Sequence, residues 1–205
     1  MFVPFLAVLF FGLIIKLLYS KDDIYWATNS IHFPLADKLA PYFTNAGDGL
    51  TTIAIVVILV LFNYRWAFLL ATSYAITSLL AQVVKHIVDA PRPLLYFKGH
   101  TDKMYLVKGV YIASYNSFPS GHTLTAFSTA IVLTYIAKNK GWGLPLFIIA
   151  VLIGYSRMYL SEHFLEDVLG GSFIGVSVTL IWLWFIDNKR FLHTPAWNRG
   201  LLKRN

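Results

Sequence analysis

Residues 168–186 of the chain read VLGGSFIGVSVTLIWLWFI and contain no charged side chain. A stretch of this kind approaches the length that a helix needs to cross a bilayer, about 20 predominantly apolar residues. Five further apolar runs precede it, and uncharged neighbours extend the shorter ones to spanning length. These runs are Phe2–Tyr19, Leu50–Phe62, Trp66–Val84, Leu124–Ala137 and Trp142–Leu160. The sequence therefore predicts an all-α fold, an integral membrane bundle of six transmembrane helices.

The overall composition agrees with a membrane protein. Hydrophobic residues make up 57% of the 205 residues and charged residues only 13%, whereas about a quarter of a soluble domain is charged. Six spans and their loops use this length, so we expect a single domain over residues 1–205. The absence of cysteine excludes disulfides, thiol catalysis and zinc–thiolate sites. The net charge of +7 is spread among the apolar runs, which argues against nucleic-acid binding and suits anionic lipid head groups.

The loops predict how the bundle is oriented. The first run has no basic residue before it and no small-residue cleavage pattern after it, so it is interpreted as a retained helix. Six spans place both termini on one side, together with the tight turns Asn63–Arg65 and Lys138–Gly141. The basic residues on that side are Arg65, Lys138, Lys140, Lys189, Arg190, Arg199, Lys203 and Arg204, against the single acid Asp187. Because basic density marks the cytoplasmic side, we expect cytoplasmic termini, with the long loops Ser20–Gly49 and His86–Pro119 facing outward.

The first long loop, Ser20–Gly49, contains seven spaced apolar residues and is interrupted by Pro34 and Pro41; the apolar residues are Ile24, Trp26, Ile31, Phe33, Leu35, Leu39 and Phe43. This pattern favours short interfacial helices that lie on the outer face of the membrane. A surface loop with a few apolar contacts is the alternative.

Ionisable residues beside a membrane are candidates for function, and here they gather at the outward ends of the predicted spans. They form three clusters, which are Lys85 with Arg92-Pro93, Pro119-Ser120-Gly121-His122, and Ser156-Arg157 with His163 and Asp167. Since all three clusters are predicted on the same side, the fold can bring them together. This convergence predicts an outward-facing active site.

Each cluster suits the binding of a phosphate. Lys85 supplies a point charge, whereas Arg92 and Arg157 supply planar forks that match phosphoryl oxygens. Ser120 is a favourable N-cap, and Gly121 lets the backbone approach an anion at the start of a helix. The alternatives are ordinary ones, because cations near helix ends also serve as membrane anchors and Ser-Gly is a common cap.

The two histidines differ in their neighbours along the chain. His163 and Asp167 are four residues apart at the predicted start of a helix, so they share a face, and the carboxylate would set the tautomer of the imidazole. Its other ring nitrogen is then free to attack phosphorus. His122 has no acidic partner nearby in sequence, which suits a proton donor. A structural His163–Asp167 pair and a capping role for His122 are the alternatives.

Taken together, the three clusters resemble the signature of the type 2 phosphatidic acid phosphatases, the PAP2 family, and in particular its small bacterial members. The matching segments are Lys85-x6-Arg92-Pro93, Pro119-Ser120-Gly121-His122 and Ser156-Arg157-x5-His163-x3-Asp167. The resemblance implies a lipid phosphatase of the bacterial inner membrane that needs neither metal nor cofactor. Glu162 and Glu166, which flank the histidine, are not signature residues and receive no role.

The resemblance also implies a role for each matching residue. His163 would be the nucleophile that forms a phosphohistidine, Asp167 would orient it, and His122 would protonate the leaving oxygen. The residues that would hold the phosphoryl oxygens are Lys85, Arg92, Ser120, Gly121 and Arg157.

The substrate would be a lipid phosphate that keeps its tails in the bilayer. Phosphatidate, phosphatidylglycerol phosphate, undecaprenyl pyrophosphate and a lipid A phosphate all fit, and the sequence does not choose among them. A transporter of phosphorylated lipids without hydrolysis is the main alternative. Vanadium haloperoxidases resemble the family's pocket, but those chains are soluble.

Overall fold

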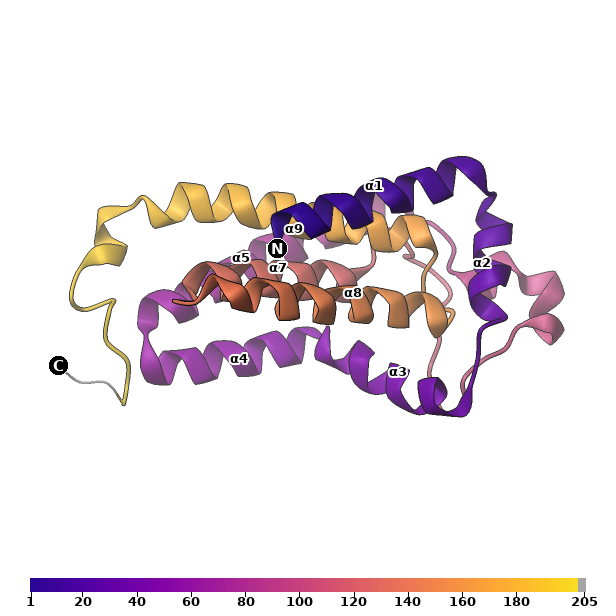
Figure 1. Ribbon diagram of the computed structural model, residues 1–205, viewed down its shortest axis with the longest axis horizontal. Helices are drawn as coiled ribbons and strands as arrows, with labels where there is room; N and C mark the ends of the chain where they lie inside the picture. Colours follow the sequence, from indigo (N-terminus) through magenta and orange to yellow (C-terminus); the bar gives the residue numbers. More distant parts are fainter. Residues whose placement is uncertain (203–205) are drawn as a thin grey trace.

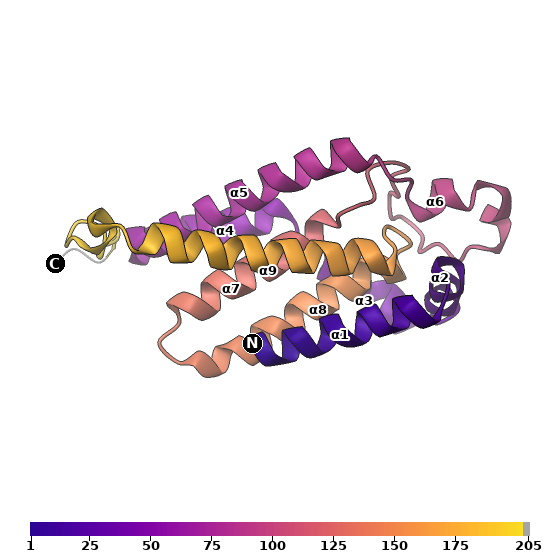
Figure 2. The same cartoon turned by 90° about the horizontal axis from the view of Figure 1, so that it is seen from above.

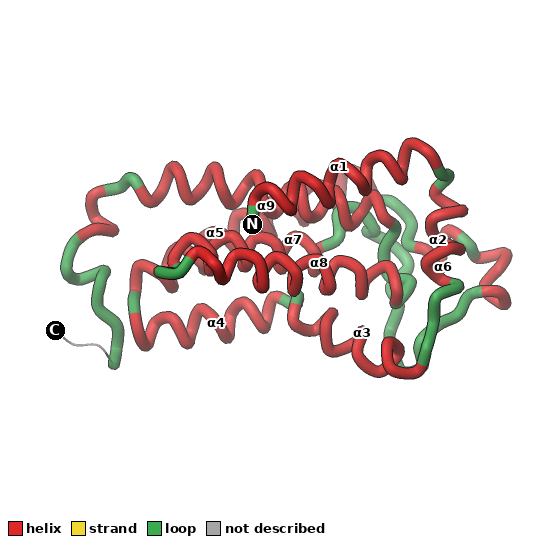
Figure 3. Tube along the Cα trace, viewed as in Figure 1, coloured by secondary structure: helices red, strands yellow, loops and turns green. Residues whose placement is uncertain are grey.

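The computed structural model describes residues 1–202, which form helices joined by loops, without a strand in that range (Figure 3). The α-helices are α1 (Phe2–Leu18), α2 (Lys21–Asn29), α3 (Pro34–Ala46), α4 (Gly49–Phe62), α5 (Tyr64–Val88), α6 (Pro93–Tyr96), α7 (Gly121–Ile136), α8 (Gly143–Tyr159) and α9 (Leu165–Asp187). Each predicted apolar run forms most of one long helix, namely α1, α4, α5, α7, α8 or α9. The all-α prediction is therefore confirmed. Lys203 and Arg204, counted above among the basic residues, lie outside the described part.

Several helices of the structure could cross a membrane. Among the described residues, three helical segments are long and apolar enough to cross a membrane: Tyr64–Tyr96, Lys140–Tyr159 and Leu165–Asp187. The pairs α1–α2 and α3–α4, bent by 112° and 54°, raise the number to five if each pair counts as one span. The remaining predicted span, α7, has 16 residues, fewer than the roughly 20 that a span needs. Residues 1–202 therefore contain three to five candidate spans, and six remains a prediction.

The helix α7 lies at the centre of the bundle, against α5, α8 and α9. Its contact with α9 is unusually close because α9 presents glycines to it. A Cβ atom added at Gly171 would lie 2.5 Å from the carbonyl oxygen of Ser120, and one at Gly175 would lie 2.6 Å from that of Leu124. The spacing of four residues places both glycines on one face of α9. This close packing sets the position of Ser120, which immediately precedes α7.

The long helices run along one axis, with the α4–α5 and α7–α8 connections and the end of α9 toward the same end of the bundle (Figure 1). Met1 packs there against Thr134 of α7 (3.5 Å between Sδ and Oγ1). The carbonyl of Arg199 accepts a hydrogen bond from the N–H of Tyr64, at 2.9 Å. Met1 thus lies beside the second half of α7 and Arg199 beside the start of α5, and the placement of both termini on one side of a membrane stays a prediction.

At the other end, the first long loop contains the two short helices that its pattern predicts, α2 and α3. Helix α2 and the segment with α6 lie together beyond the ends of the long helices (Figure 2). Tyr25 of α2 packs against Phe97, with ring centroids 4.6 Å apart, and against Phe164, at 5.9 Å. This aromatic cluster holds α2 against the turn that connects α8 to α9.

Candidate active site

The first cluster lies where α5 ends. Asp89 adopts a left-handed conformation, with φ of 41°, and ends the helix one turn after Lys85. Arg92 is extended, with φ of −80° and ψ of 165°, as its flanking prolines predict. The Lys85 ammonium donates to the carbonyl of Asn116 (3.1 Å), and Arg92 Nε donates to that of Tyr115 (3.0 Å). The loop that leads to the second cluster therefore positions both cations.

Ser120 is the N-cap residue of α7, as predicted, but its side chain makes no capping hydrogen bond. Its hydroxyl instead accepts a hydrogen bond from Thr123 Oγ1 (2.9 Å). Its backbone N–H donates to the carbonyl of Asp167 (2.9 Å), which joins the second cluster to the third. The N–H groups in the first turn of α7 have no acceptor within the helix, and the side chain of Ser120 does not cap them.

A cavity of about 170 Å³ opens beside this helix start, and Lys85, Gly121 and His122 line it. A Cβ atom at Gly121 would meet no atom within 4 Å, so the space beside its backbone is open. A helix N-terminus next to a lysine forms an environment that favours an anion.

The third cluster depends on a tight turn after α8. Ser161 has a φ of 57°, in the left-handed region that L-residues seldom adopt. The chain reverses here, so the carbonyl of Arg157 accepts hydrogen bonds from the N–H groups of both Glu162 (2.9 Å) and His163 (3.2 Å). Because α9 begins only at Leu165, the prediction that His163 and Asp167 share one helical face is wrong. The turn, and not a helix, presents His163.

His163 and Asp167 are nevertheless paired. The distance from His163 Nδ1 to Asp167 Oδ2 is 3.4 Å, and both side chains are almost completely buried. Asp167 Oδ2 accepts hydrogen bonds from Ser117 Oγ (2.5 Å) and from the N–H of Phe164 (2.9 Å), whereas His163 Nδ1 makes no hydrogen bond among residues 1–202. The carboxylate is therefore held from the loop before α7 and from the turn before α9, and it faces Nδ1 of the imidazole, so it does not engage Nε2.

The environment of His163 favours its neutral form. Burial lowers the pKa of His163 well below its ordinary value, and the nearby positive charges of Arg92 and Arg157 lower it further. The imidazole is therefore neutral at neutral pH, and a neutral imidazole is the nucleophilic form. The ion pair between Arg92 and Glu162 shows that the first and third clusters meet.

Arg157 is 5% exposed and reaches across to α3 and to the turn. Its Nη1 donates to the hydroxyl of Thr44, and its Nη2 lies 3.1 Å from a carboxylate oxygen of Glu162. The same oxygen of Glu162 pairs with Arg92 Nη1. The sequence analysis assigns no role to Glu162, but its carboxylate connects Arg92 and Arg157, two of the predicted phosphate ligands.

His122 has an acidic partner after all, from a different helix. Its Nε2 lies 3.6 Å from Oδ2 of Asp48, the N-cap residue of α4. The expectation that His122 has no such partner holds only along the sequence. The contact exists because α3 packs on α8 and ends beside His122.

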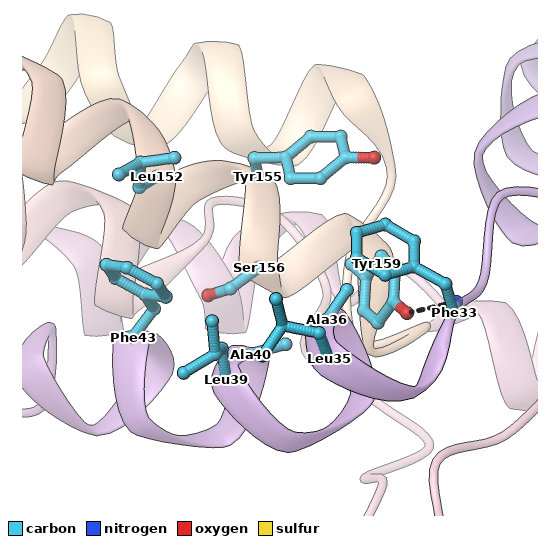
Figure 4. Close-up of a pocket in the computed structure, with 10 residues that line it drawn as sticks. All are labelled: Phe33, Leu35, Ala36, Leu39, Ala40, Phe43, Leu152, Tyr155, Ser156 and Tyr159. Atoms are coloured by element: carbon cyan, nitrogen blue, oxygen red, sulfur yellow. Dashed lines mark hydrogen bonds between the residues drawn. The ribbon is translucent and has the colours of Figure 1, made fainter.

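Figure 4 shows this packing of α3 on α8, around an apolar cavity of about 180 Å³. The N–H of Phe33 donates to the hydroxyl of Tyr159 (3.3 Å), which itself donates to Asp37 of α3 (2.6 Å). These bonds fasten the start of α3 to the end of α8. Thr44 and Asp48, further along, are thereby placed beside Arg157 and His122.

Comparison with known proteins identifies the family. Residues 66–191, more than half of the chain and all three clusters, match the PAP2 superfamily. The chain belongs to the PAP2 superfamily. The resemblance seen in the sequence is therefore confirmed.

Individual PAP2 proteins are similar to this chain. Undecaprenyl-diphosphatase BcrC of Bacillus subtilis is 29% identical over 55% of this chain and 55% of its own length. The matched stretch thus spans about half of that relative. Among solved structures, the PAP2 type phosphatidylglycerolphosphate phosphatase of Bacillus subtilis superposes with a TM-score of 0.69 at 26% identity, over 92% of this chain and 98% of that one. Aquifex aeolicus LpxE gives a TM-score of 0.67 at 28% identity, over 79% and 93%.

In this PAP2 protein the three predicted clusters converge, but they take support from residues that the sequence alone does not single out. These additional residues are Thr44, Asp48, Ser117 and Glu162. Residues 1–202 contain no group of three or more His, Cys, Asp or Glu side chains arranged to hold a metal ion. Cations and backbone N–H groups are the charge-stabilising groups that this site presents.

Proposed function

We propose that this membrane protein hydrolyses the phosphate or pyrophosphate of a lipid head group through a phosphohistidine on His163. The observation that carries the proposal is the convergence around His163. The imidazole of His163 is buried and neutral, and its Nδ1 lies beside the carboxylate of Asp167. The positive charges of Lys85, Arg92 and Arg157 are close enough to act on it. Membership of the PAP2 superfamily and the named activities of its relatives support the same conclusion.

The cations and the start of α7 bind the phosphoryl group in this proposal. Arg92 and Arg157 hold its oxygens with their forks, Lys85 adds a point charge, and Ser120 and the N–H of Gly121 donate from the helix start. Phosphoryl transfer has a loose transition state with charge on the oxygens, so positioning and charge stabilisation provide most of the catalysis. These residues provide both.

The histidines then act in sequence. Nε2 of His163 forms a bond to phosphorus while the bond from phosphorus to the leaving oxygen breaks, and Asp167 stabilises the positive charge that develops on the ring. His122, beside the carboxylate of Asp48, donates a proton to the leaving oxygen. Water then attacks the phosphohistidine and gives its proton to His122, which releases phosphate and restores both histidines.

The size of the cavity indicates how a lipid would bind. About 170 Å³ is less than the roughly 300–1,000 Å³ of sites that enclose a drug-sized molecule. Lys85, Gly121 and His122 line this cavity but Arg92, Arg157 and His163 do not, so it would take the part of the head group next to His122, and the lipid tails would remain among the apolar helices. Phosphatidate, phosphatidylglycerol phosphate, undecaprenyl pyrophosphate and a lipid A phosphate all satisfy this requirement, and the last three of these classes match relatives' names.

The first test measures phosphate release. Purified protein in detergent should release inorganic phosphate from at least one of these lipids, at the same rate with and without excess EDTA. Vanadate should inhibit, because it adopts a five-coordinate geometry that resembles the transition state. Strict dependence on added magnesium would contradict metal independence. Lipid binding without any phosphate release would favour the transporter.

We further propose six spans in a bacterial inner membrane, with cytoplasmic termini and the active site facing outward. The basic residues at the end that contains Arg65 and Lys138 support this orientation. The chain has no cysteine, so single cysteines can report it. Lys103→Cys should react with an impermeant thiol reagent in intact spheroplasts, whereas Lys138→Cys should react only after lysis. Both positions are exposed, and the reverse labelling pattern would overturn the orientation.

A further inference from the structure

Glu162 is a buried carboxylate between two arginines. Its side chain is 7% exposed, and one of its oxygens pairs with Nη1 of Arg92 and with Nη2 of Arg157, the latter at 3.1 Å. The arginines are far apart in sequence, since Arg92 lies in the loop after α5 and Arg157 in the last turn of α8. Glu162 is thus the group that connects them.

The remaining donors of Arg157 indicate where a ligand would bind. Nη1 is occupied by Thr44 and Nη2 by Glu162. Its Nε is buried and has no hydrogen-bond acceptor among residues 1–202. A buried unpaired donor on a charged group is costly, and a phosphoryl oxygen at this place would satisfy it. The pair with Glu162 therefore leaves an edge of the guanidinium free for substrate.

The charge of Glu162 has two consequences. It offsets the repulsion between two guanidinium groups that are held close together, which keeps both forks in place without a ligand. It also adds one negative charge beside the position where a phosphate dianion would bind, and like charges in a partly buried site disfavour each other. The first effect keeps the two arginines in position, and the second lowers the affinity of the site for phosphate.

We propose that Glu162 is a positioning residue that holds Arg92 and Arg157 as a pair and lowers the affinity of the site for phosphate, so that the product is released. This inference rests on the proposed function, since it assumes that the two arginines bind a phosphoryl group. Glu162 touches neither the reacting atoms nor the substrate and acts through the arginines.

The test measures binding of inorganic phosphate to the purified, full-length protein by titration calorimetry, which requires no turnover. Glu162→Gln keeps the size of the side chain and an oxygen that accepts from the arginines, but it removes the charge. Its dissociation constant for phosphate should fall about tenfold, given the strength of charge interactions a few ångströms apart in a protein. The inhibition constant of phosphate in the lipid assay should fall by the same factor. A merely structural residue would weaken binding when changed.

Two further variants make the result decisive. Glu166→Gln removes a carboxylate of the same type that pairs with Lys21 (2.9 Å), and it should leave phosphate affinity unchanged. Glu162→Asp keeps the charge, so its affinity should stay within about twofold of the wild type even if Glu162→Gln fails to fold. Unchanged or weaker binding in a folded Glu162→Gln variant, or a tenfold gain in Glu162→Asp, would overturn the proposal. Phosphate binding without lipid hydrolysis by the wild type would instead contradict the proposed function.

Discussion

Replacing His163 with alanine should abolish turnover and should remove all covalently bound phosphate. His163 is almost completely buried beside Asp167, which Ser117 Oγ and the N–H of Phe164 hold in place, whereas the other histidine, His122, lies beside the more exposed Asp48. We expect a loss of about 10⁴-fold or more, as for other enzymes that lose their nucleophile. The measurement is acid-labile, base-stable phosphate on the protein after rapid quenching with labelled substrate.

His122→Ala is the matched variant, because it removes the other histidine and leaves the nucleophile in place. Its defect should depend on the leaving group, since general acid catalysis contributes about 10²–10⁴-fold when a proton is needed. A lipid alkoxide needs that proton, whereas the phenolate of p-nitrophenyl phosphate leaves without it. His122→Ala should therefore retain relatively more activity on the artificial ester. Label that persists in His163→Ala and disappears in His122→Ala would reverse the assignment of the two roles.

Arg157→Lys should lower kcat/KM by about 10²–10³-fold although the charge is kept, a loss comparable to that of one oxyanion donor. The guanidinium contacts Thr44 and Glu162 at the same time and still has a free Nε. A lysine ammonium has one nitrogen and cannot make these contacts and hold a phosphoryl oxygen together. The rate is measured on the lipid substrate that the wild type hydrolyses.

The control for Arg157→Lys is Arg190→Lys, at an exposed position near the opposite end of the bundle. It should keep the wild-type rate. Each variant is also checked for its unfolding temperature in detergent, because Arg157 is buried. A folded Arg157→Lys protein with a near-normal rate would show that Arg157 anchors the helix and does not bind phosphate.

The local features of this protein can be predicted from its sequence. Uncharged runs such as residues 168–186 predict helices because a long apolar segment can satisfy its backbone groups only internally, and each run is helical. The extended conformation of Arg92 follows from the prolines on both sides of it. The spacing of the three clusters predicts the family, which the comparison confirms.

The tertiary structure alone decides which side chains from different elements meet. Asp48 reaches His122 from 74 positions earlier in the chain, because α3 packs on α8 and ends there. Glu162 turns toward Arg92 because Ser161 adopts a left-handed conformation, which no helical or extended pattern in the sequence indicates. That same turn places His163 before α9 and not within it. Periodicity and motif spacing describe residues that are near one another along the chain, whereas these contacts depend on how separate helices pack.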